Sequence, residues 1–334
     1  MKKTHKIKDL FRIFRAQTAS AVFIYVMIPY LAAGGNLFSW FTLVLAIWSI
    51  LTHHISFGHN TVLDTLMGWD QIDPNKSHHP LIEKRIHPHT GLKIISVGIL
   101  ILSIIAIILV YYSLGNNFYA MIAFSFVIVG GMIYDEGISK ISVFDFIPIG
   151  ICFSSLTVFS YFLISKEITL FIILLALYVF FLQWFEIGIE GEIKEIEIKE
   201  EKNMLQKLGV KCDGDTFSMG KAIIYPWIIK IIGLGIAGYI LYKYTYNYFT
   251  LSIYLIIVIF ALYFCYELTK KRKWNREKTV RDMAIEEIFS IFIIPLILMP
   301  IIGIIEIIIV ILVSLLYFVG MNKILWGTYL RPKV

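Results

Sequence analysis

The chain has 334 residues, of which 58% are hydrophobic and 16% charged, and its mean hydropathy is +0.77. This composition is too apolar for a soluble globule and predicts a polytopic membrane protein with a single domain over residues 1–334. The net charge of +6 is typical of Lys and Arg in loops beside anionic membrane lipids, so we expect no nucleic-acid partner. The three cysteines lie far apart without metal-type spacing and are expected to be bystanders.

Residues 1–17 are basic, and no small-residue cleavage site follows the next apolar run, so we expect the first helix to be retained. A membrane crossing needs about 20 apolar residues. The apolar runs predict an all-α bundle of nine transmembrane helices, or ten if residues 304–321 form a separate span. The predicted spans are roughly 18–35, 37–58, 91–114, 117–134, 143–164, 168–185, 220–241, 247–268 and 284–302, with the possible tenth at 304–321.

The distribution of basic residues predicts the orientation of these spans. Of the 30 Lys and Arg residues, 24 fall on the side that holds the N-terminus, seven of them in the basic loop at 269–283. Because basic loops remain in the cytoplasm, we expect a cytoplasmic N-terminus. The Ile- and Lys-rich composition suits an integral protein of a prokaryotic cell membrane.

A polar segment at residues 59–90 follows the second predicted span on the cytoplasmic side. Asn60 and Asp64 are four residues apart, so they share one face of a helix that continues from the span. Gly68 can break that helix and let Asp70 turn back toward them. A plain hydrophilic loop, with a turn at Asp73-Pro74, is the alternative interpretation.

A second acidic segment at residues 186–219 follows the sixth predicted span on the same side. Glu186 and Glu190 repeat the four-residue spacing at the end of that span. The sequence after them alternates acids with isoleucine, which is equally typical of a solvated amphipathic helix or a surface strand.

Together the two segments predict a site for a diphosphate held by divalent cations. Mg²⁺ binds through one or two carboxylates while substrate phosphates fill other positions. Lys140, Lys199 and Lys202 are predicted to lie near these acids at the same membrane face, where they would neutralise the remaining phosphate charge. A third cytoplasmic loop places Tyr134, Lys140 and Asp145 within reach of a bound head group, unless it is an ordinary connection.

These motifs resemble the UbiA superfamily of intramembrane prenyltransferases. In the 1,4-dihydroxy-2-naphthoate (menaquinone-pathway) branch the first motif has Asn, then Asp at +4, Gly at +8 and Asp at +10. Asn60, Asp64, Gly68 and Asp70 match that spacing. His79 precedes Pro-Leu where Arg is common in the family.

The resemblance extends over roughly residues 10–270. The stretch 134–150 is similar to the Tyr-x-x-Gly loop and the helix that follows it, and Glu186, Glu190, Lys202 and 208–209 match the second motif in outline. Three departures are Thr61 for the usual Asp, His79 for Arg, and glutamates for both aspartates of the second motif. Glu190 and Glu192 offer a second register for that motif.

The resemblance implies Mg²⁺-dependent transfer of a polyprenyl group from an allylic diphosphate to a lipophilic, aromatic acceptor that resembles a quinone precursor. Ionisation to an allylic carbocation would occur in a central cavity that opens to the cytoplasmic side and is lined with aromatic rings. The implied partners are a prenyl diphosphate donor, an aromatic or lipid acceptor, and membrane lipids.

The resemblance also implies roles for individual residues. The implied metal ligands are Asn60, Asp64, Asp70, Glu186 and Glu190. The implied diphosphate-binding residues are Lys140, Lys199, Lys202, His79 and Tyr134. The implied catalytic residues are Asp64, Asp70, Lys140 and Asp73, with Asp73 or Asp145 accepting the acceptor's proton.

Three other functions remain open from the sequence. A terpene cyclase or a prenyl diphosphate hydrolase would use the same metal site without an acceptor. A transporter would need ionisable residues near mid-membrane, where Lys230 and Glu306 are the clear cases. A degenerate family member would bind lipid or act as a scaffold without catalysis.

Overall fold

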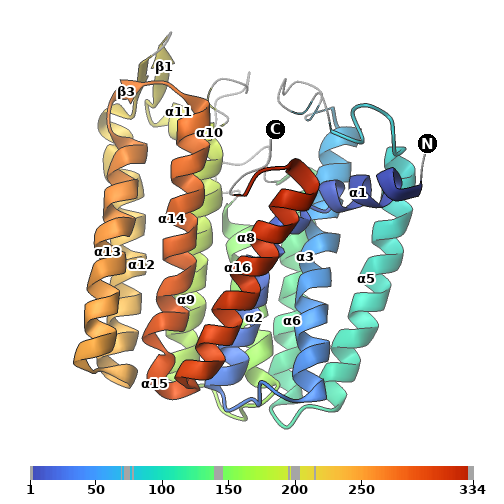
Figure 1. Cartoon of the computed structure of the whole chain (residues 1–334), viewed down its shortest axis with the longest axis vertical. Helices are drawn as coiled ribbons and strands as arrows, with labels where there is room; N and C mark the ends of the chain where they lie inside the picture. The colour runs from blue at the N-terminus through green and yellow to red at the C-terminus, as the bar shows by residue number, and fades with distance from the viewer. Residues whose placement is uncertain are drawn as a thin grey trace.

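The protein is a bundle of long antiparallel helices with a small sheet at one end (Figure 1). The computed structural model describes residues 3–68, 70, 76, 79–138, 146–194, 196, 204–213 and 216–329. Within these ranges, ten helices have 14 or more residues. They are α2 (Ala19–Ala32), α3 (Trp40–Leu66), α5 (Pro88–Tyr111), α6 (Asn117–Ile133), α8 (Phe146–Phe162), α9 (Leu170–Phe185), α12 (Ile224–Ile240), α13 (Tyr248–Thr269), α14 (Arg276–Ile297) and α16 (Ile304–Trp326).

Short segments connect or extend these helices. The helical ones are α1 (Lys3–Ile13), η1 (Ala16–Thr18), η3 (Tyr134–Ile138), η4 (Glu186–Gly191), α10 (Glu192–Lys194), α11 (Met204–Lys207), η5 (Gly220–Ile223), η6 (Leu241–Thr245) and α15 (Met299–Ile302). Of these, η3, η4 and η6 have the wider π-helical turn.

An antiparallel sheet joins the second acidic segment to the loop between α13 and α14. Its strands are β1 (Lys211–Asp213), β2 (Thr216–Ser218) and β3 (Arg272–Lys273), in the order β1-β2-β3. The sequence prediction of an all-α chain missed this sheet, because strands of two or three residues are too short to show an alternating apolar pattern.

The number of membrane crossings can be compared with the sequence prediction. In the described ranges seven helices are long and apolar enough to cross a membrane, or eight if the pair Ile7–Ile13 and Ala16–Ala32, bent by 59°, is one span. The apolar helix α8 has only 17 residues, and the first half of α14 carries several charges. Nine or ten crossings therefore stay a prediction, although α16 does form a separate helix after α15, as the possible tenth span requires.

Helix α2 lies at the centre of the packing. Its residues from Val22 to Leu31 are buried, and it packs against α3, α8 and α16. Tyr25 of α2 accepts a hydrogen bond from Gln183 Nε2 of α9 at 3.1 Å. Helix α2 therefore contacts both of the helices that end in the acidic segments, α3 and α9.

Both ends of the described chain lie at the same end of the bundle (Figure 1). Arg12 of α1 donates to the backbone oxygen of Leu325 at 2.8 Å, and its guanidinium lies 5.0 Å from the centre of the Trp326 ring. The acidic ends of α3 and α9, and the sheet, are at this end as well (Figure 1).

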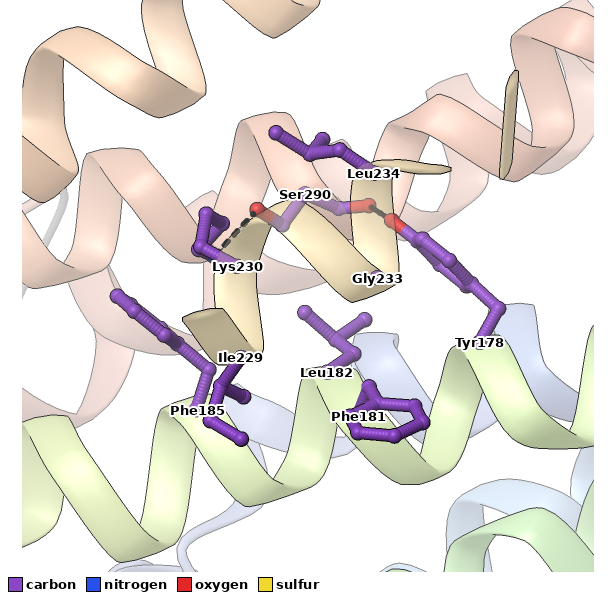
Figure 2. Close-up of a pocket in the computed structure, with 9 residues that line it drawn as sticks. All are labelled: Tyr178, Phe181, Leu182, Phe185, Ile229, Lys230, Gly233, Leu234 and Ser290. Atoms are coloured by element: carbon purple, nitrogen blue, oxygen red, sulfur yellow. Dashed lines mark hydrogen bonds between the residues drawn. The ribbon is translucent and has the colours of Figure 1, made fainter. Parts of the chain in front are cut away.

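Two internal cavities are each about 10 Å³, which is space for about one water molecule. One lies between α9, α12 and α14 (Figure 2), and the other lies between α2, α8, α9 and α14. Neither has the size of a prenyl chain. A central cavity open to the cytoplasm therefore stays a prediction.

The loop between α5 and α6 yields a stability prediction. A Cβ on Gly115 would lie 2.0 Å from the backbone oxygen of Phe162, so Gly115→Ala forces the loop away from the turn after α8. We expect a loss of about 1–3 kcal/mol in unfolding free energy, measured as a lower thermal midpoint of the detergent-solubilised protein. The matched control is Gly235→Ala in α12, whose Cβ would meet no atom within 4 Å. Equal effects of the two substitutions would contradict the packing described for this loop.

Candidate functional site

The first acidic segment is built on the end of α3. This helix ends at Leu66, and Gly68 follows with φ +85°, a conformation that side chains with a Cβ rarely adopt. The chain turns back there, and Asp70, 2% exposed, accepts a hydrogen bond from Thr65 Oγ1 at 3.4 Å and pairs with Lys76. The predicted break at Gly68 is confirmed, and Asp70 returns to the end of α3 at Thr65. Its predicted approach to Asn60 and Asp64 stays a prediction.

Asn60 and Asp64 are buried on the last turns of α3, next to η3. The Asn60 side chain hydrogen-bonds to Asp135 of η3, whose carboxylate also lies 2.7 Å from His59 Nδ1. Asp64 and Asp135 are close enough to interact electrostatically. The end of α3 and η3 therefore form one polar cluster. We call Asn60 and Asp64 of this cluster, together with Asp70 at the chain reversal that follows α3, the first half-site.

The sequence motifs did not single out His59 and Asp135. The signal available for Asp135 was its position directly after Tyr134, in the third cytoplasmic loop. Thr61, which replaces the family's usual Asp, donates from Oγ1 to the Phe57 carbonyl at 2.8 Å within its own helix. Asp135 of the adjacent η3 supplies a carboxylate beside Asn60, on a helix that lacks the family's usual Asp at position 61.

His79 was predicted to bind diphosphate in place of the family's Arg. Burial, followed by the charges of Arg15 and Lys76, lowers the pKa of His79 to about 3. Its side chain is therefore neutral near pH 7, so any bond to a diphosphate is that of a neutral imidazole. Tyr134, a second predicted contact, is the first residue of η3 beside the half-site.

The second acidic segment begins with the π-helical turn η4. Such turns are frequent at functional sites. Gln183 Nε2 at the end of α9 donates to Glu186 Oε2 at 2.6 Å, while Glu186 Oε1 has no hydrogen-bond partner in the part of the chain that the structure describes. Glu190, 1% exposed, accepts no hydrogen bond from a described N–H or hydroxyl group. We call Glu186 and Glu190 the second half-site.

Helix α14 contributes two acids that the sequence analysis missed, because it assigned them to an ordinary span. Glu286 and Glu287 interact electrostatically with both residues of the second half-site. Glu287 also lies within hydrogen-bonding reach of Glu190. Two carboxyl groups can make that contact only with a proton or a metal cation between them.

Glu192, the alternative member of the second motif, has a structural role. Its Oε2 accepts from the Leu205 backbone N–H at 2.7 Å, and its Oε1 accepts from that of Met204 at 3.3 Å. These bonds satisfy the first N–H groups of α11. The structure therefore favours the register with Glu186 and Glu190.

Several residues predicted for the site lie outside the described residues. They are Asp73, Lys140, Asp145, Lys199 and Lys202. In the described ranges, no three His, Cys, Asp or Glu side chains are close enough together to bind one metal ion. The buried Glu186 and Glu190 oxygens, which accept from no other described N–H or hydroxyl group than Gln183 Nε2, nevertheless fit a hard divalent cation, which takes carboxylate oxygen ligands.

Residues 20–283 match the model of the UbiA prenyltransferase family. The chain belongs to the UbiA prenyltransferase family. The membership confirms the resemblance seen in the motifs, and makes the chain a prenyltransferase and an integral membrane protein. No curated protein sequence matches it.

Solved UbiA structures share the fold at low sequence identity. A UbiA homologue from Archaeoglobus fulgidus, bound to DMAPP and Mg²⁺, is 13% identical with a TM-score of 0.58, over 86% of this chain and 99% of that chain. A digeranylgeranylglyceryl phosphate synthase is 15% identical with a TM-score of 0.58, over 96% of this chain and 99% of the other. These matches do not distinguish the menaquinone branch.

Substitutions of Glu190 and Glu192 can be compared to test whether the first glutamate belongs to the site and the second stabilises the fold. In metal-free buffer Glu190→Gln should raise the thermal midpoint, because it removes a buried acid that accepts from no N–H or hydroxyl group of the described residues and that lies against the Glu287 carboxyl. The expected gain in unfolding free energy is about 1–3 kcal/mol. Glu192→Ala should lower the midpoint by a similar amount, since it leaves two N–H groups of α11 without their acceptor. Destabilisation by both substitutions would contradict the assignment.

The neutral His79 predicts a pH dependence of stability. Its pKa in the folded protein, about 3, lies below the ordinary value of about 6.5. The contribution of neutral His79 to the free energy of unfolding is complete above pH 6.5. It is lost as the pH falls toward 3, because His79 takes up a proton in the unfolded chain at a higher pH than in the folded protein. Between pH 7 and 5 the thermal midpoint of His79→Gln should fall less than that of wild type. An equal fall in the two proteins would contradict a buried neutral His79.

Proposed function

We propose that this UbiA protein transfers a polyprenyl group from an allylic diphosphate to a lipophilic aromatic acceptor. The observation that carries the proposal is the pair of acidic half-sites on α3 and α9, two helices whose acidic ends lie at the same end of the bundle (Figure 1) and which both contact α2. Carboxylates buried at this depth need cations, and a donor's diphosphate needs the same cations. The basic loops support a cytoplasmic location for this end, in a prokaryotic cell membrane.

The residues present fit Mg²⁺. The proposed ligands are Asn60, Asp64 and Asp70 of the first half-site and Glu186 and Glu190 of the second. When bound, Mg²⁺ supplies positive charge that stabilises the departing diphosphate. The homologue from Archaeoglobus fulgidus binds DMAPP or GPP together with Mg²⁺, which supports the same metal and donor class here.

The chemical step balances as a substitution at the allylic carbon. The bond between that carbon and the diphosphate oxygen breaks, and its electron pair leaves with the diphosphate. The allylic cation then forms a bond to the acceptor, which loses one proton. Lys140, Lys199 and Lys202 are proposed to hold the diphosphate oxygens together with Tyr134 and neutral His79, and Asp73 to accept the proton.

The proposed acceptor is an aromatic quinone precursor. Asn60, Asp64, Gly68 and Asp70 support this choice, because they keep the spacing of the dihydroxynaphthoate branch. In this spacing the glycine falls where the chain reverses, and the reversal at Gly68 brings Asp70 back to Thr65 at the end of α3.

The experiment is pyrophosphate release from geranylgeranyl or farnesyl diphosphate by purified protein, with Mg²⁺ and a panel of aromatic acceptors that includes 1,4-dihydroxy-2-naphthoate. Asp64→Ala and Glu190→Ala should each lower the rate by about 100-fold or more, as expected for lost charge stabilisation. The matched control is Glu167→Ala, an exposed acid in the turn between α8 and α9 at the opposite end, which should keep the wild-type rate.

The other outcomes separate the competing functions. Release without any acceptor would indicate a cyclase or a hydrolase. Release only with a glycerol-phosphate lipid would replace the aromatic acceptor. Donor binding without pyrophosphate release would indicate a lipid-binding protein. Absence of donor binding would contradict the diphosphate site and would leave a transporter as the remaining alternative.

A further inference from the structure

Lys230 is a buried cation that the proposed mechanism does not use. It lies within α12 and is 5% exposed, at the cavity between α9, α12 and α14. Its ammonium donates to Glu286 and, at 3.2 Å, to Ser290 Oγ, and lies 3.6 Å from the centre of the Phe185 ring. Figure 2 shows the hydrogen bond to Ser290 and the aromatic ring beside it. All three of its N–H donors therefore have a partner.

Glu286 connects this lysine to the second half-site. The Glu286 side chain is 0% exposed, and its Oε1 accepts from Lys230 and, at 2.6 Å, from Ser290 Oγ. Its other oxygen has no hydrogen-bond partner among the described residues. Lys230 interacts electrostatically with Glu186 and Glu190 as well. The lysine thus lies within a cluster of four acids (Glu186, Glu190, Glu286, Glu287), here called the second acidic cluster.

The charges of this cluster do not balance. Among the described residues, four carboxylates face two ammonium groups, those of Lys230 and Lys194, the second of which interacts with Glu287. Two negative charges remain when every acid is ionised. An unbalanced charge of this size is very costly in a buried, apolar environment. One divalent cation would neutralise it.

We infer that Lys230 is a positioning residue that, through its ion pair with Glu286, sets the charge of the second acidic cluster so that it binds a single divalent cation. The inference rests on the proposed function, because it takes Glu186 and Glu190 as metal ligands. It adds that α12 and α14, which lie outside both acidic motifs, determine how strongly the metal is held.

The test measures divalent-cation affinity of the purified full chain in nanodiscs, without substrate. Mn²⁺ binding followed by the loss of the free-ion EPR signal gives the dissociation constant, and Mg²⁺ competition confirms the site. The variants are Lys230→Met, Glu286→Gln and the double variant. Lys243→Met is the control, since that lysine lies in η6 at the other end of α12.

The charge balance fixes the sign of each result. Lys230→Met adds one net negative charge and should tighten binding by about tenfold, whereas Glu286→Gln removes one and should weaken binding by about tenfold. The double variant restores the wild-type charge and should bind within about twofold of wild type, as Lys243→Met should.

Each alternative result has a distinct meaning. If Lys230 and Glu286 only stabilise the fold, thermal midpoints will fall while the dissociation constants stay at the wild-type value, which would overturn the inference. Should Lys230→Met not fold, Glu286→Gln still decides the point, because unchanged affinity in that variant overturns it as well. If wild-type protein binds no divalent cation even with donor added, the proposed metal site itself fails.

Discussion

The structure depends on how the bundle compensates carboxylates that are buried at one end of it. An apolar helix bundle provides few donors, so each buried acid requires a specific partner. Asp135 has His59 and Asn60, Asp70 has Lys76 and Thr65, and Glu192 has the first N–H groups of α11. Within the described part of the chain, Glu190 accepts from no N–H or hydroxyl group and has only the Glu287 carboxyl within hydrogen-bonding reach, an arrangement that favours a bound cation.

Helix α2 arranges these groups in space. Its residues from Val22 to Leu31 are buried against α3, α8 and α16, and Tyr25 bonds to Gln183 of α9 just before the second half-site. Helix α2 therefore contacts both of the helices that end in a half-site. Stability and function are connected here, because removing the buried charge of Glu190 should stabilise the metal-free protein and abolish the proposed prenyl transfer.

The sequence was most informative where a local rule determines the structure. Hydropathy predicts the helices, and a glycine at residue 68 predicts the chain reversal that returns Asp70 to α3. It was least informative where partners come from distant helices. Nothing in the neighbourhood of Lys230 or Glu286 indicates that they pair across 56 residues, and Asp135 joins the first half-site only through the packing of η3 on α3. The short strands of the sheet depend on the same kind of long-range contact.

The central claim is that the two half-sites bind one diphosphate through shared metal ions. A double-mutant cycle tests it most directly, with Asp64→Asn, Glu190→Gln and the double variant titrated with a non-hydrolysable thiolo analogue of the donor at fixed Mg²⁺. Shared binding predicts that the effects on binding free energy are non-additive by about 1 kcal/mol or more. Additivity within about 0.5 kcal/mol would show that the two acidic segments act on separate ligands, and would contradict the account.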